Sequence, residues 1–162
     1  MHEEQCRLKP GNLIPDFHLA SFDGKSIHPS DYRGSKNLIM VFAGDLAQMG
    51  PVQQFLAELT MHYAELVQEN TEVLAIIQGP VQEADRVKRT RGLPFPVLAD
   101  EDGHAHLMAG ALSSDGGPAM AVYITDRFNE ISAVYRTSHG DSIPAIDETF
   151  SQLRFIEIQC PE

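Results

Sequence analysis

Apolar residues along the chain fall into runs and periodic stretches that predict alternating strands and helices. Residues 37–43 and 73–77 are short, continuous apolar runs, the pattern of strands covered on both faces of a sheet. Between them, apolar residues from Pro51 to Val67 recur at steps of three and four, which predicts one long amphipathic helix that Pro51 opens. The order strand, helix, strand is typical of a parallel pair joined by a crossover helix.

The N-terminal part of the chain predicts a small hairpin and a helical turn. Polar and apolar residues alternate over residues 16–20, and an Asp-Gly turn separates them from a second short strand at residues 26–28. Ser30 or Asp31 is placed to cap a single helical turn after this hairpin. Residues 1–14 show no clear periodicity, so we expect them to form an extended arm.

The C-terminal half predicts further helices and a second hairpin. Helices are expected at residues 80–92, at residues 104–109, and from Pro144 onward. Residues 119–125 and 130–135 have the pattern of two strands joined by a four-residue turn. The complete order of elements predicts an α/β fold in which helices flank both faces of a mixed central sheet.

Composition and charge fit one ordinary globular domain. The 162 residues are 43% hydrophobic and contain no linker, repeat or low-complexity tract, so we expect a single domain over residues 1–162. The net charge of −11 opposes binding to nucleic acid or anionic membranes. The short basic cluster at residues 86–91 is expected to be the solvent face of a helix. No apolar run approaches the roughly 20 residues that span a bilayer, and the first residues lack a signal-peptide pattern, so we expect a cytoplasmic protein.

Three groups of short segments carry a shared pattern across residues 10–158. They are PDFHL (15–19) with DGK (23–25) and SDYRG (30–34), then GLPFPVLAD (92–100), and then VYITD (122–126) with EI (130–131). In order and spacing they resemble the AhpC/TSA type of the peroxiredoxin family. The resemblance implies a thioredoxin-like fold with an added N-terminal hairpin, and an antioxidant oxidoreductase activity, the thiol-dependent reduction of peroxides.

The loop that holds the reactive cysteine of that family is different in this sequence. In the family, the cysteine stands at the N-terminus of the helix after the strand that matches residues 37–43, where the helix dipole and free N–H groups stabilise the attacking thiolate. Residues 43–52 contain no cysteine. Against the Cys-Gly-Pro-Cys signature of thioredoxins the local match is MGPV, with Met49 and Val52 in place of the two cysteines. Neither side chain can ionise or form a disulfide, so we expect no cysteine redox cycling at this loop.

A second family residue is also replaced. The resemblance implies an arginine facing the cysteine, and counting back from Asp126 places Met120 at that position. Pro118 matches the proline that thioredoxin-fold proteins hold in cis beside the loop, and both isomers stay open at this point. We therefore predict a vestigial site made of Asp45, Gln48, Met49, Gly50, Pro51, Val52, Pro118 and Met120.

Some residues of this site have both a functional and a structural interpretation. Met49 is either a reversible oxidation target or, as we favour, a filler of the space that a cysteine pair would frame. Asp45 and Gln48 are either ligands for a polar molecule or, as we favour, hydrogen-bond partners of local backbone.

The two cysteines lie near the two ends of the chain. Cys160 resembles the resolving cysteine of some peroxiredoxins, but its place on the apolar stripe of the last helix favours a half-buried, inert thiol. Cys6 is expected in an exposed arm, and its pairing with Cys160 or a thiol-linked dimer stays open. An active thiol peroxidase that uses Cys160 or Cys6 is therefore the alternative function.

A cluster of acidic and histidine residues follows the mid-chain segment. Asp100, Asp102, His104 and His106 are metal-ligand types at close spacing. Zinc sites usually draw ligands from two rigid segments, so we expect a solvated turn here, with no metal and no cofactor.

These observations favour a redox-inactive member of the resembled family. We predict that it keeps the scaffold and serves as a binding or regulatory module for an unidentified protein or small molecule. A homodimer is implied by the resemblance alone.

Overall fold

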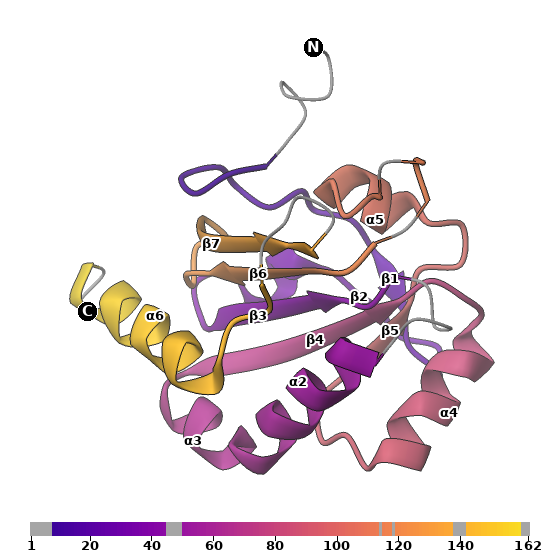
Figure 1. The fold of residues 1–162 in the computed structure, drawn as a ribbon, viewed down its shortest axis with the longest axis horizontal. Coiled ribbons are helices and arrows are strands. Elements are labelled where there is room, and N and C mark those ends of the chain that lie inside the picture. The colour runs from indigo at the N-terminus through magenta and orange to yellow at the C-terminus, as the bar shows by residue number, and fades with distance from the viewer. Residues whose placement is uncertain (1–7, 45–49, 114, 118, 138–141, 160–162) are drawn as a thin grey trace.

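A seven-stranded mixed sheet forms the centre of the computed structural model, which describes residues 8–44, 50–113, 115–117, 119–137 and 142–159 (Figure 1). The strands are β1 (Leu19–Ala20), β2 (Ser26–Ile27), β3 (Asn37–Phe42), β4 (Thr71–Ile77), β5 (Val97–Ala99), β6 (Ala121–Thr125) and β7 (Ile131–Arg136). Their order across the sheet is β2-β1-β5-β4-β3-β6-β7. The predicted α/β fold with a mixed sheet and an N-terminal hairpin is confirmed.

The three inner strands are parallel, and antiparallel hairpins extend the sheet on both sides. β3 pairs in parallel with β4, and β4 with β5, because helical crossovers connect them. β6 pairs antiparallel with both β3 and β7. Ala20 in β1 pairs with Ala99 in β5, which places the N-terminal hairpin beside the segment that follows β5.

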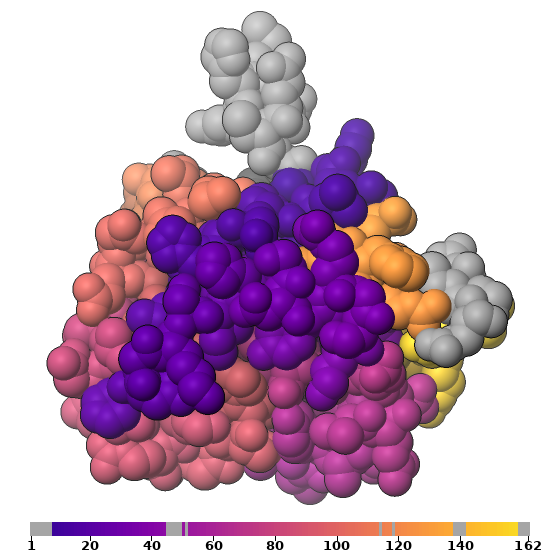
Figure 2. Space-filling model, turned by 180° about the vertical axis from the view of Figure 1, so that it is seen from behind, coloured from indigo at the N-terminus to yellow at the C-terminus, as the bar shows by residue number. Residues whose placement is uncertain are grey.

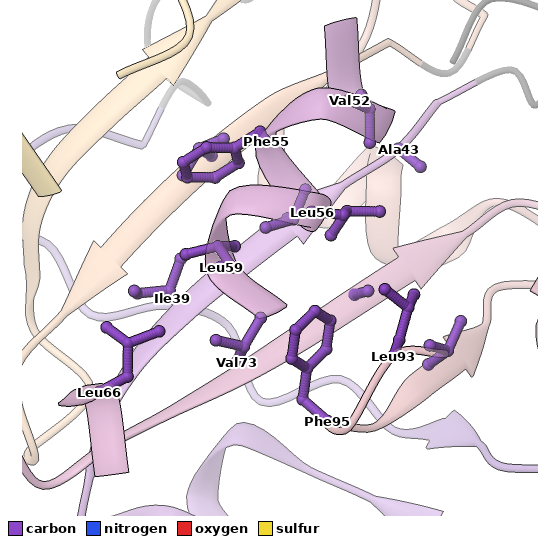
Figure 3. Packing of buried hydrophobic residues seen from close by; sticks show 14 of the residues in the cluster. Ile39, Ala43, Val52, Phe55, Leu56, Leu59, Leu66, Val73, Leu93 and Phe95 are labelled. Carbon is purple, nitrogen blue, oxygen red and sulfur yellow. The ribbon is translucent and has the colours of Figure 1, made fainter. Parts of the chain in front are cut away.

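Helices cover both faces of this sheet. They are the 3-10 turn η1 (Pro29–Tyr32), α2 (Gly50–Met61), α3 (Tyr63–Gln68), α4 (Val81–Arg91), α5 (His104–Ala109) and α6 (Ile146–Gln159). Ile39 and Val41 in β3 share a core with α2, α3, α4 and α6 (Figure 3), whereas Leu38 and Met40 share a second core with α5 and the N-terminal segment. Figure 2 shows that segment, in indigo and violet, spread over the back of the molecule. All six residues of β3 are buried, as a strand covered on both faces requires.

The prediction of one helix from Pro51 to Val67 is wrong, because the segment forms α2 and α3, separated at His62. The hydroxyl of Thr60 donates a hydrogen bond to the Leu56 carbonyl at 2.8 Å. Such a bond from a hydroxyl to the preceding turn competes with the helix backbone and bends it. Val67, predicted on the apolar face, is 47% exposed.

The helical turn after β2 begins earlier than predicted. His28 is its N-cap and Pro29 its first residue, so neither Ser30 nor Asp31 has the N-cap position. Asp31 still stabilises the turn, because its Oδ2 accepts a hydrogen bond from the His28 N–H at 2.8 Å. Ser30 instead donates its N–H and hydroxyl to the carboxylate of Asp16.

The basic cluster at residues 86–91 lies on α4. Arg86 pairs with Glu83 at 2.6 Å and Arg89 with Asp85 at 2.7 Å, all on α4. Arg86 and Arg89 therefore lie on the predicted solvent face of the helix. Lys88 does not, because it is half-buried and its ammonium donates to the Leu93 and Phe95 carbonyls. Within the ranges that the structure describes, no helix has both the length and the apolar character needed to cross a bilayer.

Candidate functional site

The predicted site lies where β3 ends and α2 begins. Gly44 follows β3, and Gly50 is the first residue of α2. The side chain of Pro51 lies outside what the structure describes, as do these whole residues: Asp45, Gln48, Met49, Pro118, Cys6 and Cys160. The interpretations of these residues, including the isomer of Pro118, stay predictions.

Val52 and Met120 are the two predicted site residues whose side chains are described beside this loop. Val52 is 1% exposed, and Met120 is half-buried against the same core, the one that α2 covers. Phe42 in β3 pairs with Ala121 in β6, which brings Met120 beside the end of β3. The side chains of Val52 and Met120 therefore both pack in the apolar core that α2 covers.

The backbone at the base of the loop is closely packed. Gly44 has a φ of +68°, and a Cβ at this position would lie 2.8 Å from the Ala119 carbonyl carbon and 3.0 Å from the Met120 nitrogen. Any larger residue would be strained by the left-handed backbone and would collide with the neighbouring chain. The loop therefore starts from a position that only glycine fits.

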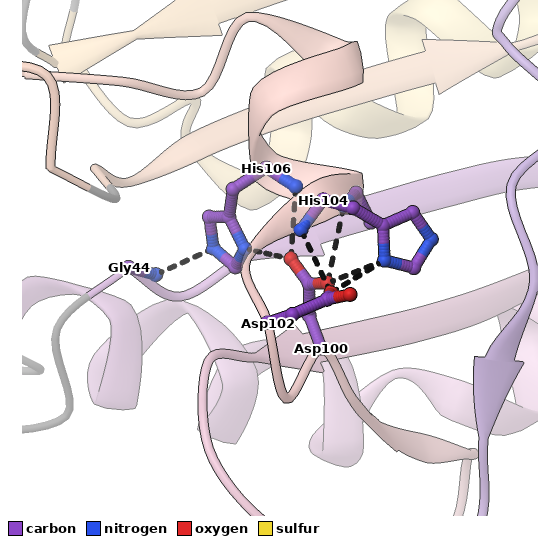
Figure 4. A network of polar contacts seen from close by, with 6 residues as sticks. Gly44, Asp100, Asp102, His104 and His106 are labelled. Carbon is purple, nitrogen blue, oxygen red and sulfur yellow. Dashed lines mark hydrogen bonds and ion pairs between the residues drawn. The ribbon is translucent and has the colours of Figure 1, made fainter.

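A buried histidine and aspartate hold Gly44 from the α5 side (Figure 4). The Gly44 N–H donates to His106 Nε2 at 3.2 Å, and His106 Nδ1 lies 2.8 Å from Asp100 Oδ2. Asp100 is 1% exposed and His106 is fully buried. Because Nε2 accepts a hydrogen bond, the proton of the neutral imidazole sits on Nδ1, from which it is donated to the carboxylate.

Asp100 accepts hydrogen bonds through both carboxylate oxygens. Oδ1 accepts from the Ala105 N–H at 3.1 Å, and Oδ2 from the His106 N–H at 2.9 Å as well as from the imidazole. Burial by itself raises the pKa of Asp100, but these hydrogen bonds outweigh it, so the pKa lies below its ordinary value of 3.8. The carboxylate is therefore charged in the folded protein at neutral pH.

The prediction of a solvated turn for the acidic and histidine cluster is wrong for two of its four members. Asp100 and His106 are buried, whereas the side chain of Asp102 is 77% exposed and that of His104 is 34% exposed. A signal for burial was present, because Asp100 directly follows a buried strand and His106 shares a helix face with Ala109, three residues on. The contact with the Gly44 N–H joins residues 62 positions apart, and no local pattern indicates it.

Arg136 lies near Met120 in the sheet but does not replace the family's arginine. It pairs with Ala121 across β6 and β7. Its guanidinium lies 5.4 Å from the centre of the Tyr123 ring, and Nη2 donates to the Leu8 carbonyl at 2.6 Å. Tyr123 belongs to the core on the α5 side, whereas Met120 packs on the α2 side. Arg136 therefore anchors the N-terminal segment on the opposite face.

Asp100→Asn tests the carboxylate directly. We expect a loss of about 2 kcal/mol in the free energy of unfolding at neutral pH, because an amide offers one oxygen where two accept N–H groups. In the wild type, the contribution of Asp100 is fully present above its ordinary pKa of 3.8 and is lost as the pH falls through the lowered folded-state pKa. Urea unfolding between neutral pH and about pH 3 should therefore show a shallower acid loss in the variant.

The exposed neighbour Glu101 supplies the matched control. Glu101→Gln removes an adjacent charge without touching the buried pair, so its acid profile should follow that of the wild type. If Asp100→Asn and Glu101→Gln gave the same profile, the buried carboxylate would have no special role in acid stability.

A surface hollow of about 200 Å³ lies at the other end of the sheet. It is lined by residues that include Pro10, Gly11, Asp126, Glu130 and Phe155. β6 begins with Ala121 near Gly44 and ends beside this hollow, so the hollow is separate from the loop at residue 44.

Comparison with known proteins agrees with this architecture. Peroxidoxin BcpB from Mycobacterium tuberculosis superposes with a TM-score of 0.76 at 16% identity, over 94% of this chain and 98% of that one. A cysteine-to-serine mutant of PrxQ from Xylella fastidiosa gives a TM-score of 0.76 at 14% identity, over 94% and 98% of the two chains. These similarities establish that this chain has the thioredoxin-like fold that peroxiredoxins share.

Sequence relatives point to the same group. Alkyl hydroperoxide reductase E of Mycobacterium tuberculosis is 33% identical over 93 residues, which cover 57% of this chain and 60% of that protein. Peroxiredoxin Bcp of Escherichia coli is 27% identical over 95 residues, 59% and 60% of the two chains. The matched region thus spans about three-fifths of each of these relatives. The profile of the AhpC/TSA family matches residues 10–134, and the chain belongs to this family.

Proposed function

We propose that this chain is a redox-inactive member of the AhpC/TSA family that acts as a binding or regulatory module. The observation that carries the proposal is the composition of the loop between β3 and α2, since residues 43–52 contain no cysteine. Val52, at the second cysteine position, is a buried aliphatic side chain that belongs to the core. Peroxide reduction in this family needs a thiolate, and neither Met49 nor Val52 can supply one.

The scaffold around the loop supports binding as the retained role. Gly44 is fixed by its packing against Ala119 and by its hydrogen bond to His106. Binding residues commonly lie on loops that a rigid scaffold positions, so a fixed residue at the base of this loop fits a binding role. The partner that fits this proposal is a protein or a small molecule of unidentified chemistry.

The proposal predicts no thiol-dependent peroxide turnover. Consumption of hydrogen peroxide and of an alkyl hydroperoxide should stay at the background of the reductant for the wild type, for Cys6→Ser and for Cys160→Ser. The alternative, an enzyme that uses a relocated thiol, predicts wild-type activity that one of these variants abolishes. That result would overturn the proposal and identify the reactive cysteine.

A gain-of-function variant tests the register of the loop. We expect Met49→Cys with Val52→Cys to form a reducible disulfide, because these positions match the two cysteines of the thioredoxin signature Cys-Gly-Pro-Cys. Thiol titration before and after mild oxidation should show a loss of two thiols, and Met49→Cys alone should show no such loss. A double variant that folds but forms no disulfide would mean that this register is wrong.

The assembly state and the location belong to the same proposal. A homodimer and a cytoplasmic location fit the family, and light scattering of the purified chain would measure the assembly state.

A further inference from the structure

Three histidines from separate segments gather on the surface beside the N-terminal hairpin. His18 precedes β1, His28 follows β2, and His104 is the first residue of α5. The ring centre of His18 lies 5.7 Å from that of His28 and 5.6 Å from that of His104. The pairing of β1 with β2 and β5 brings them together, so the cluster is a product of the fold and has no counterpart in the local sequence.

The imidazole of His104 is already oriented by carboxylates. Its Nδ1 lies 2.7 Å from Asp102 Oδ1 and 3.3 Å from Asp100 Oδ1. Because ionised carboxylates only accept, the ring proton is on Nδ1 and Nε2 presents a lone pair. Nε2 is shielded from solvent and has no hydrogen-bond partner among the described residues. A histidine whose Nδ1–H is held by a carboxylate while Nε2 is free has the arrangement typical of zinc ligands.

We propose that His18, His28 and His104 form a binding site for a zinc ion, with Asp102 as the residue that positions His104. Two imidazoles on one tetrahedral zinc ion, with Zn–N bonds of about 2 Å, have ring centres about 5 Å apart. The two observed separations are slightly longer, and the ligand atoms of the three histidines do not all lie within 4.8 Å of one another. Zinc binding therefore requires the side chains of His18 and His28 to rotate toward His104. Three imidazoles and one water complete a tetrahedral shell.

The local charge favours a cation at this position. Asp16 lies close enough to His28 for the two to interact electrostatically, and Asp31 accepts a hydrogen bond from the His28 N–H. Asp102 in turn lies beside His104, so two of the three histidines have neighbouring carboxylates, in a chain whose net charge is −11. These negative charges attract a cation.

An oxygen-ligand site for a hard cation is the competing arrangement, and the hydrogen bonds argue against it. Ligand atoms of Asp100, Asp102 and His104 lie within 4.8 Å of one another. However, both oxygens of Asp100 already accept hydrogen bonds from Ala105 and His106, and Nδ1 of His104 carries a proton. The free lone pair on His104 points to imidazole partners and to zinc, which imidazole ligands suit.

Isothermal titration of the full chain with Zn²⁺ tests the proposal. The host carries Cys6→Ser and Cys160→Ser, so that thiols do not compete for the metal. We expect one Zn²⁺ per chain, and affinity that falls about tenfold or more in each of His18→Gln, His28→Gln and Asp102→Asn. His62→Gln, a histidine at the junction of α2 and α3, is the matched control and should bind as the host does. Titration with Co²⁺ should give the intense visible absorption of a tetrahedral site, which His18→Gln abolishes.

Several outcomes would overturn the proposal. They are the absence of Zn²⁺ binding by the host, unchanged affinity in His18→Gln and His28→Gln, or an equal loss in His62→Gln. His18 is exposed and His28 half-buried, so these substitutions should leave thermal unfolding nearly unchanged, and unfolding curves show whether an affinity loss reflects the site. Peroxide assays do not involve these histidines, so this proposal and the proposed function fail independently.

Discussion

We expect His106→Phe to lower the free energy of unfolding by about 3 to 5 kcal/mol, the range for removing one partner of a buried polar pair. The phenyl ring keeps the apolar contacts of the imidazole, including the edge-to-face contact with Phe42 at 5.1 Å between ring centres. It loses the acceptor for the Gly44 N–H and the donor to Asp100. The variant would therefore leave a buried carboxylate short of a partner and a backbone N–H without one.

Urea unfolding at neutral pH measures this loss. His62→Phe is the matched control, because His62 has a partly exposed side chain that pairs with Glu65 on the surface and makes a ring contact with Phe150 that a phenyl ring can keep. Its replacement should cost less than about 1 kcal/mol. The double variant Asp100→Asn with His106→Phe should cost less than the sum of the two single changes, since both act on one hydrogen-bonded unit. Equal effects of His106→Phe and His62→Phe would show that the buried pair contributes no stability.

Local sequence patterns predicted the elements of this fold well, because each depends on its own residues. The apolar run at residues 37–43 is β3, and Gly92 ends α4 in a left-handed conformation, as glycine at that position indicates. The break at His62 was missed, because the apolar spacing continues across it and the local feature that accompanies it is the hydrogen bond from the Thr60 hydroxyl to the Leu56 carbonyl. Such a bond depends on a side-chain rotamer that the apolar spacing does not specify.

The candidate site was predicted less completely, because its support comes from distant segments. Counting from Asp126 matched Met120 to the family's arginine, and this match stays a prediction; the pairing of β6 with β3 places Met120 beside the end of β3. The hydrogen bond from Gly44 to His106 and the gathering of His18 with His104 both join residues far apart in the chain. Contacts of this kind depend on strand order, which periodicity does not determine.

Gly44→Ala has the second large expected effect, a loss of about 2 to 5 kcal/mol in the free energy of unfolding. Two costs add: about 1 to 2 kcal/mol for a left-handed backbone with a side chain, and about 1 to 3 kcal/mol for the overpacking that displaces Ala119 and Met120. The collision is with backbone atoms, which cannot rotate out of the way. Displacement there also strains the hydrogen bond from residue 44 to His106.

Gly34→Ala separates these two costs. Gly34 has a φ of +85° and has no atom within 4 Å of where a Cβ would lie, so alanine there bears the backbone strain alone, about 1 to 2 kcal/mol. The difference between the two variants in the free energy of unfolding therefore measures the cost of the collision between an alanine at residue 44 and the backbone of Ala119 and Met120. If the two alanine variants were equally stable, β3 and the segment before β6 would be farther apart than the structure places them, and the loop would not start from a rigid position.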